Sequence, residues 1–275
     1  MKPAPGFIGV FDSGLGGLSV LPHIRQYLPN ESVVYVADAA HLPYGERSKA
    51  YVLERAHRLT RFFLEQGAKA IAIPCNTATA AAVADLRKSY PDLPFIGIEP
   101  AVKPAARLTR SGTVGVLATT GTLGSEKFKA LVEREAPRCR VLLKPCPDWV
   151  LAVEENWTHA ERLRIVRGPV QALLDEGADT LVLGCTHFPL LLPEIELVAG
   201  KRVALLDTGA PFARELQRQL NARALLRIEE GGVQVFFAST NNAPDLLARA
   251  ERLAGQALIA LPWREALVFE HGRPA

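Results

Sequence analysis

The sequence lacks long hydrophobic runs, has few cysteines and carries little net charge. No stretch reaches the about 18 consecutive apolar residues of a membrane-spanning helix, so we expect neither a span nor a signal peptide. The formal charge is only +3 and the basic residues form no long cluster, which argues against nucleic-acid binding as the main task. A length of 275 residues with 48% apolar side chains suggests one large domain or two smaller ones.

The four cysteines are Cys75, Cys139, Cys146 and Cys185, and none belongs to a CxxC pair. We expect a cytoplasmic protein, in which thiols stay reduced and no disulfide framework forms. No histidine lies between Cys139 and Cys146, so the sequence predicts no zinc site there. The thiols are therefore candidates for chemistry rather than for cross-linking.

Short β-rich runs alternate with amphipathic stretches of helical period, for example 48–66 and 160–175. This alternation predicts an α/β fold of mainly parallel strands covered by helices on both faces, with ligands bound beyond the carboxyl ends of the strands. The predicted strands are 7–11, 33–37, 70–74, 95–97, 113–117, 140–143, 180–184, 203–206 and 233–238.

A weak internal repeat runs through the chain. "FFLEQGAKAIAIPCNT" (62–77) aligns without a gap with "ALLDEGADTLVLGCTH" (172–187), and "IGVFDSG" (8–14) parallels "VGVLATT" (114–120). We interpret the two halves as copies of one βα design. If the halves face each other, their strand ends share one cleft.

Cys75 and Cys185 occupy matched positions in this repeat, each at the end of an apolar strand and before a polar turn. Such a turn usually opens a helix, whose N-terminus lowers a thiol pKa, so we expect reactive thiols. A cysteine hydrolase, a dithiol redox site and a two-base site that exchanges a proton between two faces of a carbon all remain open.

The first loop, "DSGLGGLS" (12–19), is glycine-rich but is not a nucleotide cradle. It has neither GxGxxG nor a GK[ST] ending, and Asp12 at its mouth would repel phosphate. Its glycines and the helix that follows favour an anion such as a carboxylate. Asp12 can bind an ammonium group or assist a thiol, and His187, two residues after Cys185, can serve that thiol as base or as imidazolium.

These motifs together resemble the glutamate racemases, the cofactor-independent enzymes that supply D-glutamate for bacterial peptidoglycan. The segments that carry the resemblance occur in the family's order: "FDSGLGGLSV" (11–20), "ADAAHLPYGERS" (37–48), "PCNTATA" (74–80), "VGVLATTGT" (114–122), "CPDWVLAVE" (146–154) and "LGCTHFPLL" (183–191).

The resemblance implies that Cys75 and Cys185 are the two catalytic bases. It implies that Asp12 and His187 assist them and that Asp38 and Glu154 are supporting acids. It also implies substrate contacts from the segments above, namely Asp12, Ser13, Pro43, Tyr44, Gly45, Asn76, Thr77, Thr119, Thr122, Thr186 and His187.

For the whole chain, the resemblance implies two similar α/β domains related by a pseudo-twofold axis, with the active site between them. We expect residues 1–98 plus 208–275 in the first and 99–207 in the second. The substrate would be glutamate, with no cofactor, metal, nucleic acid or membrane, and a homodimer is one oligomeric state to consider. The alternatives are an aspartate or other amino-acid racemase on the same scaffold, a thiol hydrolase using Cys185 and His187, or a non-enzymatic binding protein.

Overall fold

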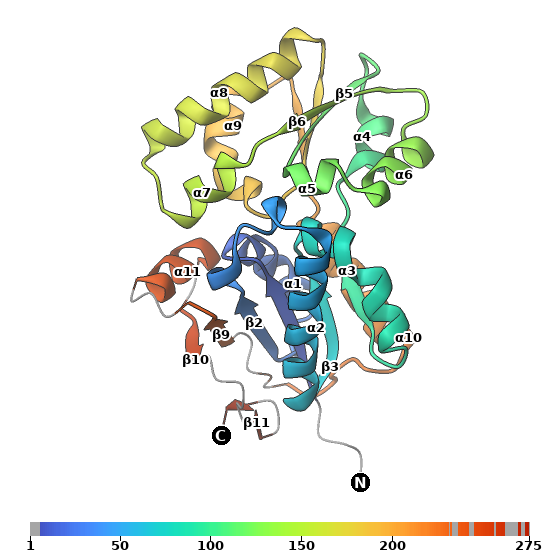
Figure 1. The fold of residues 1–275 in the computed structure, drawn as a ribbon, viewed down its shortest axis with the longest axis vertical. Coiled ribbons are helices and arrows are strands. Elements are labelled where there is room, and N and C mark those ends of the chain that lie inside the picture. The colour runs from blue at the N-terminus through green and yellow to red at the C-terminus, as the bar shows by residue number, and fades with distance from the viewer. Residues whose placement is uncertain are drawn as a thin grey trace.

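The computed structural model describes residues 6–230, 232, 236–241, 245–255, 257–261, 269–270 and 273–274. It contains two separate sheets, stacked along the long axis of the molecule, in which every pair of neighbouring strands is parallel (Figure 1). Helices cover both faces of each sheet, so the predicted α/β class is confirmed. Within the described residues, no helix is long and apolar enough to cross a membrane.

The first sheet has the strand order β10-β9-β2-β1-β3-β4. Its central strands are buried along their whole length, as expected for a parallel sheet covered on both faces. The two strands at one edge of the sheet, β10 and β9, come from the C-terminal part of the chain. The strands are β1 (Phe7–Asp12), β2 (Val33–Ala37), β3 (Ala68–Ile73), β4 (Phe95–Gly97), β9 (Phe236–Ser239) and β10 (Ile259–Leu261).

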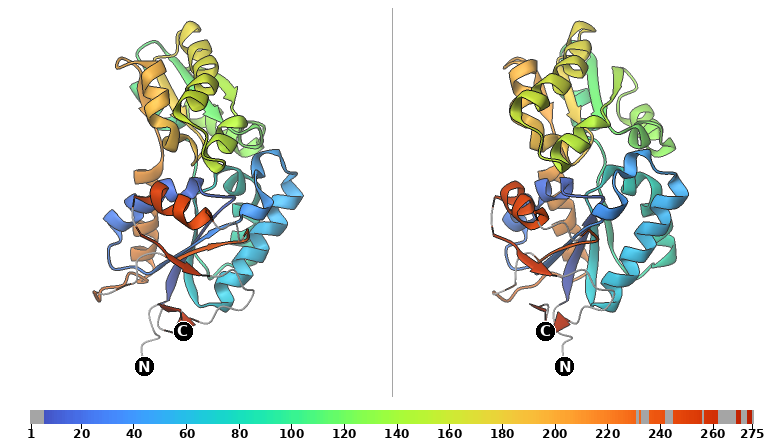
Figure 2. Two further views of the ribbon diagram at one scale, coloured as in Figure 1. Left: turned by 90° about the vertical axis from the view of Figure 1, so that its left-hand side faces the viewer. Right: turned by 60° about the vertical axis from the view of Figure 1, so that its left-hand side comes forward.

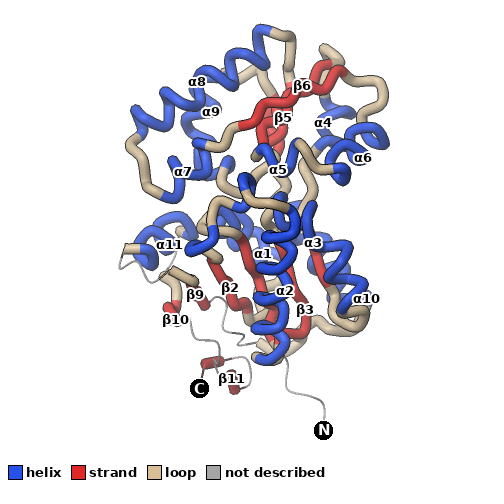
Figure 3. Tube along the Cα trace, in the orientation of Figure 1, coloured by secondary structure: helices blue, strands red, loops and turns tan. Residues whose placement is uncertain are grey.

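Two helical layers enclose this sheet (Figures 2 and 3). One face is covered by α1 (Leu21–Tyr27), α10 (Gly209–Ala222) and α11 (Leu246–Ala254), and the other by α2 (Lys49–Glu65) and α3 (Asn76–Ser89). Three 3-10 turns lie at its carboxyl edge: η1 (Gly16–Val20), η2 (Ala39–His41) and η3 (Tyr44–Glu46).

The second sheet has the order β6-β5-β7-β8. The strands are β5 (Thr113–Ala118), β6 (Arg140–Pro145), β7 (Thr180–Leu183) and β8 (Ala204–Leu206). Its helical elements are α4 (Val102–Leu108), α5 (Thr120–Leu123), α6 (Glu126–Glu135), α7 (Asp148–Glu154), α8 (His159–Asp175), η4 (Phe188–Leu191) and α9 (Leu192–Ala199). A separate antiparallel pair joins β11 (Phe269–Glu270) to β12 (Arg273–Pro274).

The internal repeat has a structural counterpart. Four strands of the first sheet, β2-β1-β3-β4, have the same relative order as β6-β5-β7-β8 of the second. The matched glycines also share a conformation, since Gly67 has φ +84° and Gly177 φ +90°. Each lies two residues after the last helical residue, where a left-handed glycine turns the chain into the next strand. The sequence match therefore reflects one helix–turn–strand unit used twice.

The strand predictions are confirmed in number and order up to 206, with boundaries shifted by up to two residues. The predicted strand 70–74 begins earlier, at Ala68, because the turn at Gly67 already directs the chain into the sheet. Of the predicted strand 233–238, residues 233–235 lie outside the described part, and β10 has no counterpart among the predictions. The chain passes between the sheets near 98–101 and 207–208. This supports the proposed domain boundaries, which remain a prediction.

The two matched glycines give a direct test of the shared turn. We expect Gly67→Ala and Gly177→Ala each to lower the free energy of unfolding by about 1–2 kcal/mol, because an L side chain is strained at positive φ. No other atom lies within 4 Å of a Cβ added at either position, so crowding does not contribute. Urea unfolding measures the change. Asparagine at the same positions should cost less, because it tolerates this conformation better than alanine, and Ala variants as stable as the parent would refute the assignment.

Candidate active site

The two matched cysteines lie at the carboxyl ends of corresponding strands and line one cavity. Cys75 follows β3 and caps α3, where its Sγ accepts the Ala78 N–H at 3.4 Å. Cys185 follows β7, and both side chains are buried. The cavity is lined by residues from both halves of the molecule. The predicted shared cleft is therefore present.

Most of the predicted site residues line this cavity, and Val150 joins them without having been predicted. The lining residues are Asp12, Ser13, Pro43, Tyr44, Gly45, Cys75, Asn76, Thr77, Thr119, Val150, Cys185, Thr186 and His187. The predicted residues Asp38, Glu154 and Thr122 are not among them. Each instead hydrogen-bonds to a lining residue. Their position indicates action through a neighbour, while the role of every site residue remains a prediction.

Asp12 is completely buried at the end of β1 and connects the two halves of the molecule. Its Oδ1 accepts the backbone N–H of Ser13 at 2.6 Å and lies 3.1 Å from the Ser13 hydroxyl. Its Oδ2 accepts the hydroxyl of Thr186, from the second sheet, at 2.7 Å. Asp12 therefore combines a local turn cap with a contact across the cleft.

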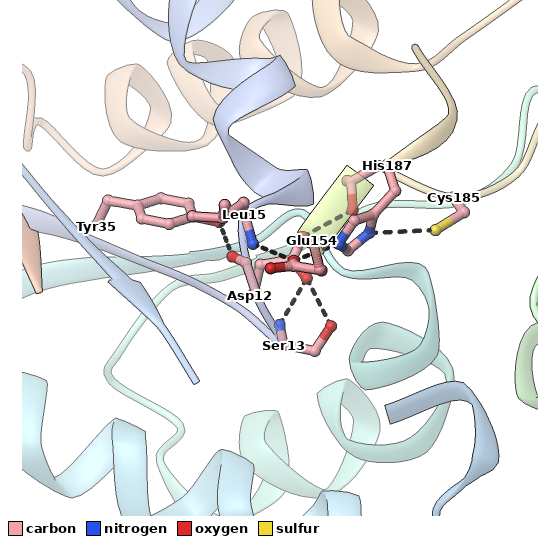
Figure 4. A network of polar contacts seen from close by, with 9 residues as sticks. Asp12, Ser13, Leu15, Tyr35, Glu154, Cys185 and His187 are labelled. Atoms are coloured by element: carbon pink, nitrogen blue, oxygen red, sulfur yellow. Dashed lines mark hydrogen bonds and ion pairs between the residues drawn. The ribbon is translucent and has the colours of Figure 1, made fainter. Parts of the chain in front are cut away.

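His187 is held between a thiol and a carboxylate (Figure 4). Its Nδ1 lies 3.6 Å from Cys185 Sγ, and its Nε2 lies 2.7 Å from Glu154 Oε1. Burial lowers the pKa of His187, but hydrogen bonds to Cys185 and Glu154 outweigh it and hold the pKa well above its usual value. The ring is therefore set up to be an imidazolium, which stabilises a neighbouring thiolate.

Cys75 differs from the expectation of a lowered thiol pKa. Burial, reinforced by the negative charge of Asp12, raises the pKa of Cys75 well above its usual value, and the Ala78 N–H at the helix start does not compensate. The helix expected directly after Cys185 is also absent, because Thr186 and His187 precede the short turn η4. At Cys75 the cost of burying a charge therefore exceeds the stabilisation that the helix N-terminus gives a thiolate.

Asp38 is fully buried at the end of β2 and belongs to an ion pair that the sequence did not reveal. Arg55 of α2 donates Nε and Nη2 to its two carboxylate oxygens at 2.9 and 2.7 Å. Tyr44 also donates its hydroxyl to Asp38. Asp38 therefore holds the Pro43–Gly45 turn against the cavity, and its carboxylate is already engaged by three donor groups of two residues.

Three threonine hydroxyls meet where the sheets face each other. Thr77 at the start of α3 lies 3.0 Å from Thr119 and 3.3 Å from Thr122, while Thr119 donates to Thr122 at 2.9 Å. Hydroxyl groups can donate as well as accept. Thr77 and Thr119, which line the cavity, and the first N–H groups of α3 can donate to an anion on this side.

The comparison with known proteins places these features in a family. The model of the Asp/Glu/Hydantoin racemase family matches residues 8–216. A glutamate racemase of Ectopseudomonas mendocina is 54% identical over 240 residues, which is 87% of this chain and 91% of the relative.

Solved structures agree. The chain is similar to a glutamate racemase of Bacillus anthracis with a TM-score of 0.82 at 31% identity, covering 95% of this chain and 98% of that one. It is also similar to the glutamate racemase of Francisella tularensis in complex with D-glutamate, with a TM-score of 0.82, 28% identity and the same coverage.

The two-sheet α/β fold and these relatives thus define a racemase, an enzyme of the isomerase class. More particularly, the chain belongs to the Asp/Glu/Hydantoin racemase family, alongside the glutamate racemases. The family resemblance stated from the sequence is confirmed. Among the described residues, no three His, Cys, Asp or Glu side chains are grouped as metal ligands.

The buried Arg55–Asp38 ion pair should be important for the stability of the fold. We expect Arg55→Leu to lower the free energy of unfolding by about 3–5 kcal/mol, because it leaves the Asp38 carboxylate buried without its cation. Lys129→Met, which breaks an exposed pair with Glu126, should leave the free energy of unfolding close to that of the parent, because solvent screens exposed ion pairs. Chemical denaturation measures both, and equal effects would contradict the assigned importance of burial.

The raised pKa of Cys75 predicts how this thiol reacts. Because the thiolate is the nucleophile, the rate of Cys75 alkylation by iodoacetamide should be low at pH 7 and still rise beyond pH 9. Peptide mass spectrometry separates Cys75 from the other three cysteines, and free cysteine provides the reference rate. A rate that levels off below pH 8 would show that the pKa is not raised.

Proposed function

We propose that this enzyme interconverts L- and D-glutamate by a two-base mechanism with Cys75 and Cys185 as the bases. The observation that carries the proposal is that two buried thiols from corresponding strands line the same cavity. Removal of a proton from one face of Cα and delivery to the other requires one acid/base group on each side. The identity to glutamate racemases supports glutamate as the substrate.

The unequal surroundings of the thiols support opposite starting roles. The imidazole of His187, whose pKa is raised, lies 3.6 Å from Cys185 Sγ, whereas burial and Asp12 raise the pKa of Cys75. In one direction the Cys185 thiolate takes the Cα proton and the Cys75 thiol protonates the other face. In the reverse direction the roles exchange. One proton leaves and one arrives, so the sites exchange protonation state with each turnover.

Binding of the substrate follows from the lining. The N–H groups and side chains at the start of α3, Asn76 and Thr77, provide donors to one substrate carboxylate. The hydroxyls of Ser13 and Thr186 donate to Asp12 and hold its carboxylate in place. The Tyr44–Gly45 turn can hold the second carboxylate. Asp12 offers the charge that an ammonium group needs. A fixed polar surround of this kind stabilises the carbanion-like state without reorganisation.

The resemblance to enzymes that provide D-glutamate also supports a role in supplying peptidoglycan synthesis. The cytoplasmic location and the homodimer remain predictions. Cys75, Cys185, Asp12 and His187 would perform the chemistry without a cofactor.

Incubation with L-glutamate in D₂O tests the reaction. We expect optical rotation to disappear while solvent deuterium enters Cα of the newly formed D-glutamate. Cys75→Ala and Cys185→Ala should each lower turnover by about 10² to 10⁴ or more, because each removes an acid/base group. Cys146→Ala is the matched control, since Cys146 is equally buried but does not line the cavity.

The same assay distinguishes glutamate racemisation from the alternative activities. If the enzyme turned over L-aspartate faster than L-glutamate, its substrate would be aspartate. Wild-type turnover by either cysteine variant would exclude the two-base mechanism. The Cys185–His187–Glu154 arrangement also matches the nucleophile, base and orienting residue of a thiol hydrolase. That activity would cleave a bond in the substrate and survive Cys75→Ala.

A further inference from the structure

Tyr35 is a buried tyrosine of β2 whose hydroxyl the proposed chemistry does not use. Its ring stacks on Phe237 of β9, with centroids 6.1 Å apart and an interplanar angle of 12°. Its hydroxyl does not line the cavity, but donates to the backbone carbonyl of Gly14 at 2.6 Å. This carbonyl belongs to the glycine-rich loop that follows Asp12.

The carbonyl of Gly14 and the N–H of Leu15 are two ends of one peptide group. The Leu15 N–H donates to Glu154 Oε1 at 2.6 Å, and the same oxygen lies 2.7 Å from His187 Nε2. Tyr35 is therefore connected to the His187 ring through one peptide and one carboxylate oxygen. Figure 4 shows this row of groups, which starts in the first sheet and ends at Cys185 in the second.

The peptide group transmits position because it is planar. Rotation about the bonds that flank it moves its carbonyl and its N–H together. Glycine at position 14 leaves that rotation free of side-chain hindrance. It is also required for the close approach, because a Cβ at Gly14 would overlap Glu154 Oε1. The two hydrogen bonds at the ends of the peptide therefore fix its orientation.

We propose that Tyr35 is a positioning residue for the Cys185–His187 pair. Its hydroxyl fixes the Gly14–Leu15 peptide, whose N–H fixes Glu154, which in turn orients the imidazole toward the thiol. The catalytic part of this inference rests on the proposed function, whereas the effect on the Cys185 thiol does not. Tyr35 would thus act from the first sheet on an acid/base group of the second.

Tyr35→Phe tests the inference, because it keeps the stacked ring and removes only the hydroxyl. We expect iodoacetamide to alkylate Cys185 about five- to tenfold more slowly at pH 7, the equivalent of about one hydrogen bond, with Cys75 unchanged. Tyr27→Phe is the matched control, since its hydroxyl contacts Arg214 on the same sheet's helical layer and no site residue. Thermal unfolding of both variants shows whether they are folded.

The alkylation result stands whether or not the enzyme racemises glutamate. An unchanged Cys185 rate, or equal slowing at Cys185 and Cys75, would overturn the proposal. If the parent enzyme shows no racemisation, only the proposed function fails.

Isotope effects extend the test to turnover. The two enantiomers of a racemase substrate have equal free energy, so kcat/KM is equal in both directions and cannot show which base is impaired. The isotope effect measured with Cα-deuterated substrate does show which base is impaired. This isotope effect increases for the enantiomer whose proton is removed by the impaired base. We expect Tyr35→Phe to raise the isotope effect for one enantiomer only. This should be the enantiomer whose isotope effect also rises in His187→Asn. Equal increases for both enantiomers would indicate a general structural defect and refute the positioning role.

Discussion

A buried carboxylate oxygen joins the two halves beside the cavity that both thiols line. Glu154 Oε1 accepts the Leu15 N–H of the first half and contacts His187 of the second. A carboxylate that is 6% exposed is costly unless such partners replace its water. The arrangement of the cavity therefore depends on both halves being closed together, because separation would leave this charge with only one of its two donors.

The two thiols have matched backbones but different chemistry. The strand, the turn glycine before it and the cysteine after it correspond in both halves. The residues that follow do not: Asn76 begins a long helix, whereas His187 places a cation beside Cys185. A symmetric fold with two identical thiols would leave their protonation states degenerate. The unequal neighbours give the two thiols different electrostatic surroundings, because burial and Asp12 raise the pKa of Cys75 whereas His187, with its raised pKa, lies beside Cys185.

The sequence was sufficient for the features that depend on local order. Polar residues after apolar strands predicted Cys75 and Cys185 in one cleft, because parallel strands end at one edge of each sheet. It did not reveal Tyr35, which lies within the continuous apolar run "VVYVA" and has the pattern of a core residue. Arg55 was missed for a similar reason, since it lies in an amphipathic helix 17 residues from Asp38. A buried ion pair across that separation has no periodic signature.

Contacts between the halves are the other part that sequence could not supply. Leu15 and Glu154 are 139 residues apart, and Asp12 and Thr186 are 174 apart. Both pairs depend on how the sheets face each other. Both also place a carboxylate of one half on a donor of the other, so opening the cleft breaks two charge-assisted hydrogen bonds together. Each such bond contributes about 1.5–3 kcal/mol. The relative position of the two halves is therefore coupled to the orientation of Asp12 and, through Glu154, to that of His187, the two charged groups beside the thiols.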